Sequence, residues 1–194
     1  MVTPDSPVVL ALAGGVGGAK LALGLALCLS PDDLMICVNT GDDETFHGLH
    51  VSPDLDTMMY TLSGLSNQEN GWGLAGDTFT ALEMLRKFGV DTWFNLGDRD
   101  FATHIRRTQL LAEGKTLSEV TTELNRSLGV FHGVTPMSND PVKTVLQTDE
   151  GELPMQRYFV GRRAEPKVSE VRYLGAENAA AAPGLQNTLA RAGL

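Results

Sequence analysis

The sequence predicts an α/β fold in which helices flank a parallel β-sheet and a small β-hairpin is inserted late in the chain. Two observations lead to this prediction. Near the start, an apolar run, a glycine-rich turn, a run of helix formers and a second apolar run follow one another, as in a right-handed β-α-β unit. Later, two alternating runs surround "DEG", which is typical of a hairpin with its tip at residues 149–151.

The first unit opens with "VVLALA", Val8 to Ala13, which is short and apolar throughout. Such a run predicts a strand that is covered on both faces. The glycines of "GGVGG" then form the turn, "AKLALGLALCL" forms the helix, and "DLMICVNT" supplies a second buried strand.

Helix signals follow. Ser52 is a candidate N-cap, Pro53 suits the first helical position, and Asp54 and Asp56 suit the positive end of the helix dipole. The amphipathic "DTFTALEMLRKFG" predicts a helix that ends at its glycine. We expect "TWFNL" to be another strand, with a helix after it through "FATHIRRTQLLAEG".

Two helices complete the expected chain. "TLSEVTTELNRSLG" opens with a Thr116–Glu119 capping box and stops at Gly129. The alanine-rich "AENAAAAPGLQNTLARAGL" predicts a last helix. Because the β-α pattern stops on that helix, we expect one domain over residues 1–194 that lacks a later strand.

The composition narrows the class of protein. The chain has 194 residues, 42% hydrophobic and 20% charged, with a net charge of −9 and a pI near 4.8. This acidic balance argues against nucleic-acid binding, and no run reaches the ~18 apolar residues of a membrane span. Two cysteines without metal-type spacing, both expected to be buried, favour a reduced, cytoplasmic compartment.

The glycine turn is the first candidate site. Lys20 replaces the third glycine of a dinucleotide fingerprint, and Ala19 and Leu21 break the P-loop pattern. Backbone N–H groups and the helix N-terminus of such a turn still favour an anion such as a phosphate, with Lys20 adding positive charge. The alternative is a tight strand–helix turn with a solvated lysine.

Acidic side chains follow the second strand and precede the next helix. They are Asp42 and Asp43, beside Asn39, and then Asp54 and Asp56. Ligands of open α/β sheets bind beyond the carboxyl ends of the strands, and carboxylates there are suited to Mg²⁺. The alternative is that these loops are solvated.

A third group of polar residues lies in "NLGDRDFATHIRR". Asp98 and Asp100 flank Arg99 and are expected to fix its guanidinium for bidentate binding of a phosphate or ribityl group. His104 is either a packed helix residue or a catalytic one, and at least one of the two arginines after it is expected on a solvated face. Trp72, between glycines, is either a surface plug or a platform for a planar ligand.

Together, these segments resemble the 2-phospho-L-lactate transferase (CofD) family of coenzyme F-420 biosynthesis. The resemblance rests on "AGGVGGAK", "VNTGDD", "SPDLDT", "GWG", "LGDRDFATHIRR", "PMSNDPV" and "GRRAEPKV", in that order along nearly the whole chain. It implies a Rossmann-like α/β core and a homodimer. It also implies that the family fold continues beyond residue 194.

The resemblance implies a reaction as well. A phospholactyl-type group would pass from a guanosine diphosphate-linked donor to the ribityl hydroxyl of 7,8-didemethyl-8-hydroxy-5-deazariboflavin, with release of GMP and with Mg²⁺ as the metal. Asp56 and Arg99 would be catalytic residues that bind the acceptor, and Asp56 is the expected proton acceptor. Asp43 and Asp54 would bind metal and substrate. The remaining expected contacts are Asn39 and Thr40 for the substrates, and Gly14, Gly15, Gly17, Gly18 and Lys20 for the donor phosphates.

Alternative functions stay open. A nucleotide-sugar-binding regulator of the same superfold would share the glycine turn and the "NTxDD" loop, but is not expected to carry "SPDLDT" together with "LGDRDxATHI". An inactive fragment that still binds the deazaflavin is the other alternative.

Overall fold

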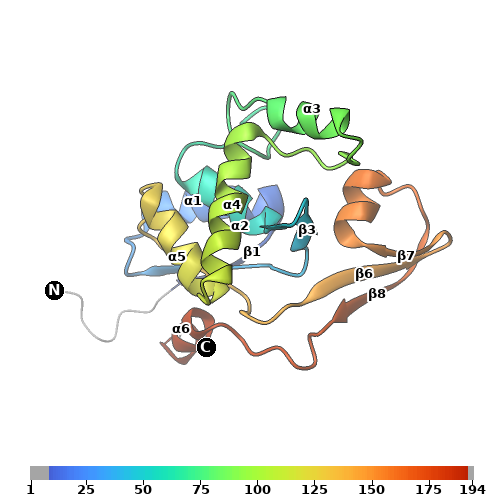
Figure 1. Ribbon diagram of the computed structural model, residues 1–194. Coiled ribbons are helices and arrows are strands. Elements are labelled where there is room, and N and C mark those ends of the chain that lie inside the picture. The colour runs from blue at the N-terminus through green and yellow to red at the C-terminus, as the bar shows by residue number, and fades with distance from the viewer. Residues whose placement is uncertain (1–8, 192–194) are drawn as a thin grey trace.

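The computed structural model describes residues 9–191 and confirms the α/β class (Figure 1). The central sheet has three parallel strands in the order β1 (Val9–Ala13), β2 (Leu34–Val38) and β5 (Gly133–Pro136). Helix α1 (Gly15–Cys28) connects β1 to β2, so the predicted β-α-β unit is confirmed. Val8, which the prediction placed in the first strand, lies outside the described residues. Strand β5 was not predicted.

The main core lies between this sheet and the helices. Ala19 and Ala22 of α1 pack with Ile36 of β2 and with Met58 of α2 (Pro53–Leu62) in one buried cluster. The expectation that the first strand is covered on both faces is wrong, because Leu12 is 71% exposed. β1 is an edge strand of this sheet, and the faces of an edge strand are covered only where a helix reaches it.

The helix signals are mostly confirmed. α3 (Thr80–Lys87), α4 (Asp98–Ala112) and α5 (Leu117–Ser127) lie where the sequence predicted helices. α5 begins with the expected capping box of Thr116 and Glu119. The expected cap of α2 is wrong, because Ser52 makes no side-chain cap hydrogen bond and its hydroxyl donates to Asp43 Oδ2 instead, at 2.7 Å.

The segment "TWFNL" is not a strand in the structure. Its aromatic side chains pack instead on a short hairpin of β3 (Glu44–Phe46) and β4 (Leu49–Val51), which was not predicted. The Phe94 ring stacks on Phe46 with centroids 4.1 Å apart, and the Trp93 ring meets Phe46 edge-on at 5.4 Å. Apolar and aromatic residues favour a strand locally, but here side-chain packing satisfies them without a partner strand.

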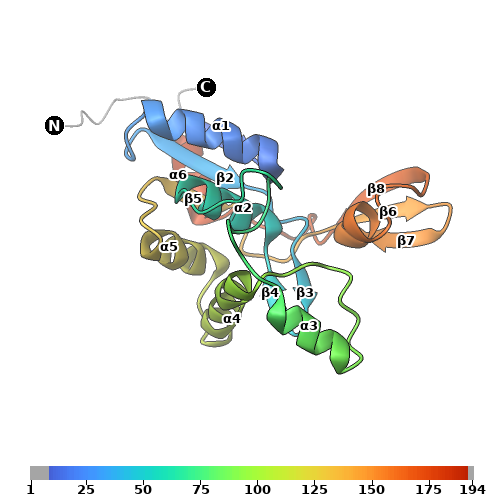
Figure 2. The same ribbon diagram turned by 90° about the horizontal axis from the view of Figure 1, so that it is seen from above.

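The predicted late hairpin is confirmed and extended. β6 (Lys143–Thr148) and β7 (Gly151–Pro154) are antiparallel, and β8 (Val168–Leu174) pairs with the other edge of β6. This second sheet lies to one side of the parallel sheet (Figure 2). The second run of the hairpin was expected to be longer, but after Pro154 the chain turns into a π-helical segment, η1 (Arg157–Gly161).

The last helix is shorter than predicted. α6 (Pro183–Arg191) starts at a proline, and the alanine run before it is not helical. Residues 192–194 of the expected helix lie outside the described residues. Between residues 9 and 191, no helix combines the length and the apolar character that a membrane span requires. Cys37 is buried as expected, whereas Cys28 is exposed.

Candidate active site

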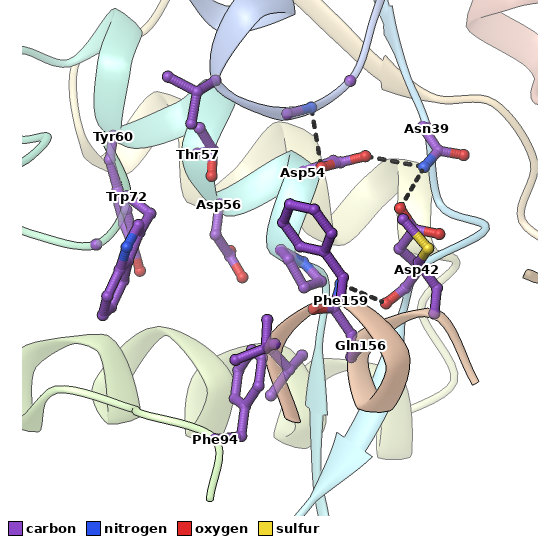
Figure 3. A pocket seen from close by; sticks show the side chains of 18 of the residues that line it. Asn39, Asp42, Asp54, Asp56, Thr57, Tyr60, Trp72, Phe94, Gln156 and Phe159 are labelled. Atoms are coloured by element: carbon purple, nitrogen blue, oxygen red, sulfur yellow. Dashed lines mark hydrogen bonds between the residues drawn. The ribbon is translucent and has the colours of Figure 1, made fainter. Parts of the chain in front are cut away.

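A cavity of about 840 Å³ opens beyond the carboxyl ends of β1 and β2. Its wall comes from the glycine turn, from α2 and the start of α4, and from the loops that carry Trp72 and Phe94. Residues of the η1 segment close the remaining side, so that chain segments far apart in sequence meet here (Figure 3). Parallel α/β sheets place their ligands at this edge.

One end of the cavity is organised around Asp54. Its Oδ1 accepts a hydrogen bond from the Gly15 N–H at 2.9 Å, and its Oδ2 accepts one from the Asn39 amide at 2.8 Å (Figure 3). Gly15 has a φ of +58°, a conformation that favours glycine. One of the backbone donors expected to face a phosphate is therefore already bonded to a carboxylate.

The two adjacent aspartates after β2 lie in different surroundings. Asp42 lines the cavity, and its Oδ2 accepts a 3.2 Å hydrogen bond from Asn39. Burial, followed by the nearby charges of Asp54 and Asp43, raises the pKa of Asp42. Asp43, which the sequence analysis favoured as a ligand, is not part of the cavity wall and bonds to Ser52 and His50. Burial also raises the pKa of Asp43.

A buried ion pair joins α2 to α4. The Arg107 guanidinium donates to both oxygens of Asp56, with Nη1 3.2 Å from Oδ2. Arg107 is only 2% exposed and Asp56 is 5% exposed. A solvated face was predicted for at least one of the two arginines, and this holds for Arg106, whose side chain is 44% exposed and paired with Glu123. The role of Arg107 was not predicted.

A second cluster lies next to this pair. The Tyr60 hydroxyl donates to Asp100 Oδ1 at 2.6 Å, and the buried His104 ring places Nε2 3.3 Å from the same oxygen. His104 Nδ1 lies 3.3 Å from Arg107 Nη1. Residues 100, 104 and 107 recur at helical spacing on one face of α4, opposite residues 56 and 60 of α2. That spacing is the sequence signal that could have found this cluster.

The other end of the cavity is aromatic. Trp72 and Tyr60 lie there, away from Asn39 and Asp42, whereas Phe94 and Phe159 contribute to the wall between the two ends (Figure 3). Trp72 is 45% exposed and Phe159 is 60% exposed, so both side chains are accessible to a ligand. Of the two alternatives for Trp72, its place in the cavity wall favours the platform for a planar ligand.

The positively charged residues that were predicted to bind the substrates, Lys20 and Arg99, lie outside the cavity wall. Lys20 is exposed on α1 and is not part of the cavity wall, nor are Gly17 and Gly18. Arg99 is exposed, and its Nη1 donates to the Ala75 carbonyl oxygen at 2.9 Å. The flanking carboxylates do not hold its guanidinium as expected, because Asp98 binds the start of α3 and Asp100 binds Tyr60.

Thr40 is buried, and it too stands outside the cavity wall. Asp77, which the sequence analysis did not select, caps α4 by accepting from the backbone N–H groups of Arg99 at 2.9 Å and of Asp100 at 3.1 Å. It thereby fixes the backbone from which Asp100 enters the cavity.

The charged side chains of the cavity wall indicate whether the site suits the implied Mg²⁺. Among the described residues, the wall contains the carboxylates of Asp42, Asp54, Asp56 and Asp100 but no lysine or arginine. A diphosphate would meet carboxylates but no cationic lysine or arginine side chain of this wall, so an accompanying cation would favour its binding. Within residues 9–191 no group of three or more candidate metal ligands occurs. Mg²⁺ commonly uses one or two carboxylates together with substrate phosphates, so Asp42 and Asp54 fit a metal that binds with its substrate.

The fold and the site define a Rossmann-like α/β protein with a ligand cavity at the carboxyl edge of its parallel sheet. The family model for 2-phospho-L-lactate transferase CofD matches residues 9–194. The chain therefore belongs to the CofD family, which confirms the resemblance seen in its sequence motifs.

Named relatives agree with this assignment. The chain is 45% identical over 189 residues to a phosphoenolpyruvate transferase of Streptomyces avermitilis, covering 95% of this chain and 59% of that protein. It is 43% identical over 182 residues to a 2-phospho-L-lactate transferase of Methanopyrus kandleri, covering 93% and 58%. The chain thus spans about three fifths of the length of these curated relatives.

A solved structure supports the fold alone. A member of the UPF0052 family from Bacillus halodurans aligns with a TM-score of 0.57 at 15% identity, over 96% of this chain and 56% of that one. Together, these similarities establish a CofD-family fold.

Proposed function

We propose that this chain binds 7,8-didemethyl-8-hydroxy-5-deazariboflavin and transfers a phospholactyl-type group to its terminal ribityl hydroxyl. The donor is a guanosine diphosphate-linked compound that carries a lactyl, enolpyruvyl or glyceryl unit on its second phosphate, and GMP is released. One observation carries the proposal: in a CofD-family chain, a single cavity has an aromatic end and an end built from the glycine turn and carboxylates.

The aromatic end suits the deazaflavin ring system. A planar heterocycle between the Trp72 and Phe159 rings buries large apolar area and leaves its ribityl chain free to extend along the cavity. The carboxylates of the cavity wall then lie along the path of that chain, where they accept hydrogen bonds from its hydroxyl groups. These carboxylates are Asp42, Asp54, Asp56 and Asp100.

The glycine end suits the donor diphosphate. Gly14 and Gly15 line this end, and the N-terminus of α1 adds positive potential. When bound, Mg²⁺ would neutralise diphosphate oxygens, and Asp42 and Asp54 are the residues that would hold it. For Lys20 and Arg99, the proposed phosphate-binding roles require their side chains to turn toward the cavity when the donor binds.

The reaction needs orientation and charge neutralisation more than a covalent nucleophile. The hydroxyl oxygen of the acceptor attacks the phosphorus atom next to the three-carbon group, and GMP leaves. The family resemblance adds the homodimer as a separate proposal, which sedimentation of the purified chain would test.

A fluorescence titration with the deazariboflavin tests the proposal. We expect saturable binding to the chain and an affinity at least about fivefold lower in Trp72→Ala, since ring stacking is worth about 1–3 kcal/mol per base in comparable sites. Phe88→Ala is the control, because Phe88 is 74% exposed and outside the cavity wall.

Turnover is then measured as GMP release with Mg²⁺ and each of the three donors. Binding without turnover would favour the inactive deazaflavin-binding alternative. A folded chain that binds no deazariboflavin would refute the proposal.

A further inference from the structure

The carboxylates of the cavity differ in how many of their oxygens are already engaged. Asp54 uses one oxygen for the Gly15 N–H and the other for Asn39. Asp56 uses both oxygens for Arg107. To take a proton from a substrate, Asp56 would have to give up part of a buried ion pair and leave Arg107 uncompensated, which is unfavourable.

Asp100 is held on one side and open on the other. Its Oδ1 accepts from Tyr60 and faces His104, whereas its Oδ2 accepts no hydrogen bond from any residue between 9 and 191. The side chain is 14% exposed and lines the cavity. The backbone N–H of Asp100 is fixed by Asp77. Asp100 therefore contributes to the cavity wall from a fixed backbone, and one of its oxygens is free of hydrogen bonds to the described residues.

The neighbours of Asp100 keep it ionised. Burial opposes ionisation, but the nearby His104 ring, the Tyr60 hydroxyl and the charge of Arg107 together lower the pKa of Asp100. Burial and the charges of Asp56 and Asp100 raise the pKa of Tyr60, so its proton stays in place as a donor. The buried His104 ring lies between the two side chains, with Nδ1 3.3 Å from Arg107 Nη1 and Nε2 3.3 Å from Asp100 Oδ1.

We propose that Asp100 Oδ2, rather than Asp56, binds the terminal hydroxyl of the acceptor and takes its proton, and that Tyr60 and His104 are positioning residues. The inference rests on the proposed function. As the hydroxyl oxygen forms its bond to phosphorus, the O–H proton passes to Asp100 Oδ2. The bond between that phosphorus and the GMP oxygen breaks, and its electron pair leaves with GMP.

Asp42 is less suited to this role. It lies at the glycine end, beside Asp54 and Asn39, where the diphosphate and its metal are proposed to bind. Asp100 lies instead among Tyr60, His104 and the aromatic wall, on the side proposed for the acceptor. A hydroxyl between the two ends has the phosphate on one side and Asp100 on the other.

Binding of two probes tests the contact without requiring turnover. The probes are the deazariboflavin and an analogue in which hydrogen replaces the terminal hydroxyl. A hydrogen bond to a charged group is worth about 1.5–3 kcal/mol, so we expect the chain to prefer the first probe by about tenfold or more. In Asp100→Ala this preference falls below about twofold, with the affinity for the deoxy probe unchanged.

The control is Glu113→Ala, an exposed carboxylate at the other end of the same helix, which keeps the preference. Acidification provides a second readout, because protonation of Asp100 weakens its hydrogen bond to the hydroxyl. Tyr60→Phe removes a donor to Asp100, so we expect the loss of preference to occur at higher pH than in the unmodified chain. A purely structural role for Tyr60 would not move that pH.

The proton transfer itself is tested by the rate of GMP release. Asp100→Asn should lower kcat by about 10²–10⁴-fold, whereas loss of the charged hydrogen bond should raise the acceptor Kd by only about tenfold. If the chain binds neither probe, the proposed function and this inference both fail. If the chain binds the deazariboflavin but Asp100→Ala keeps the preference, or Asp100→Asn releases GMP at the original rate, this inference alone is overturned.

Discussion

The buried pair of Asp56 and Arg107 gives a quantitative prediction for stability. Arg107→Met removes the guanidinium but keeps an unbranched side chain, so Asp56 stays buried without its partner. Breaking a buried pair by removing one member costs about 3–5 kcal/mol. Because a domain has a total stability of about 5–15 kcal/mol, this loss is a large fraction of the whole.

Urea unfolding followed by circular dichroism measures the free energy of unfolding. The matched control is Arg106→Met, the same change one residue earlier on the same helix. Arg106 is exposed and pairs with Glu123 at 2.7 Å, and an exposed pair contributes about 0–1 kcal/mol. We therefore expect a difference of at least about 2 kcal/mol between the two variants, since the buried pair costs about 3–5 kcal/mol to break.

A double variant guards against a single variant that does not fold. Asp56→Leu with Arg107→Met replaces the pair by apolar side chains, which is often neutral for stability, so we expect it to regain most of the loss. The assignment of a compensated buried pair is wrong if Arg107→Met and Arg106→Met have the same stability. It is also wrong if the double variant loses as much stability as Asp56→Leu alone and Arg107→Met alone lose together.

Two further predictions concern the glycine turn and the start of α4. A Cβ at Gly18 would lie 3.0 Å from the Ala13 Cβ and 3.1 Å from its Cα, whereas a Cβ at Gly24 of the same helix would meet nothing within 4 Å. Thermal unfolding should show Gly18→Ala destabilised by about 1–3 kcal/mol and Gly24→Ala stabilised by up to about 1 kcal/mol. Equal effects of the two substitutions would contradict this prediction. The pKa of Asp98 is lowered to about 2 by its hydrogen bonds to Thr78 and the α3 backbone, so its contribution is present above about pH 4 and is lost as the pH falls toward 2. Asp98→Asn should flatten this acid limb, and parallel pH curves for the two proteins would refute the reasoning.

The local features of the fold could be read from the sequence because they depend on neighbours within one or two turns. The capping box of Thr116 and Glu119 and the separate strand, turn and helix segments of the β-α-β opening are of this kind. The strand predicted at "TWFNL" failed for the opposite reason. Its residues have strand propensity, but Phe94 satisfies its apolar surface on Phe46, nearly fifty residues away, and no such contact is visible in a local pattern.

For the candidate site, the sequence by itself determined which segments carry the polar residues: the glycine turn, the loop after β2, the start of α2 and the start of α4. Only the tertiary structure decided which side chain of each segment reaches the cavity. Asp42 lines it and Asp43 does not, and Arg107 neutralises Asp56 while Arg99 lies outside. The reason is physical: adjacent residues point in different directions, and whether a charge is buried, paired or open to a ligand depends on the element packed against it.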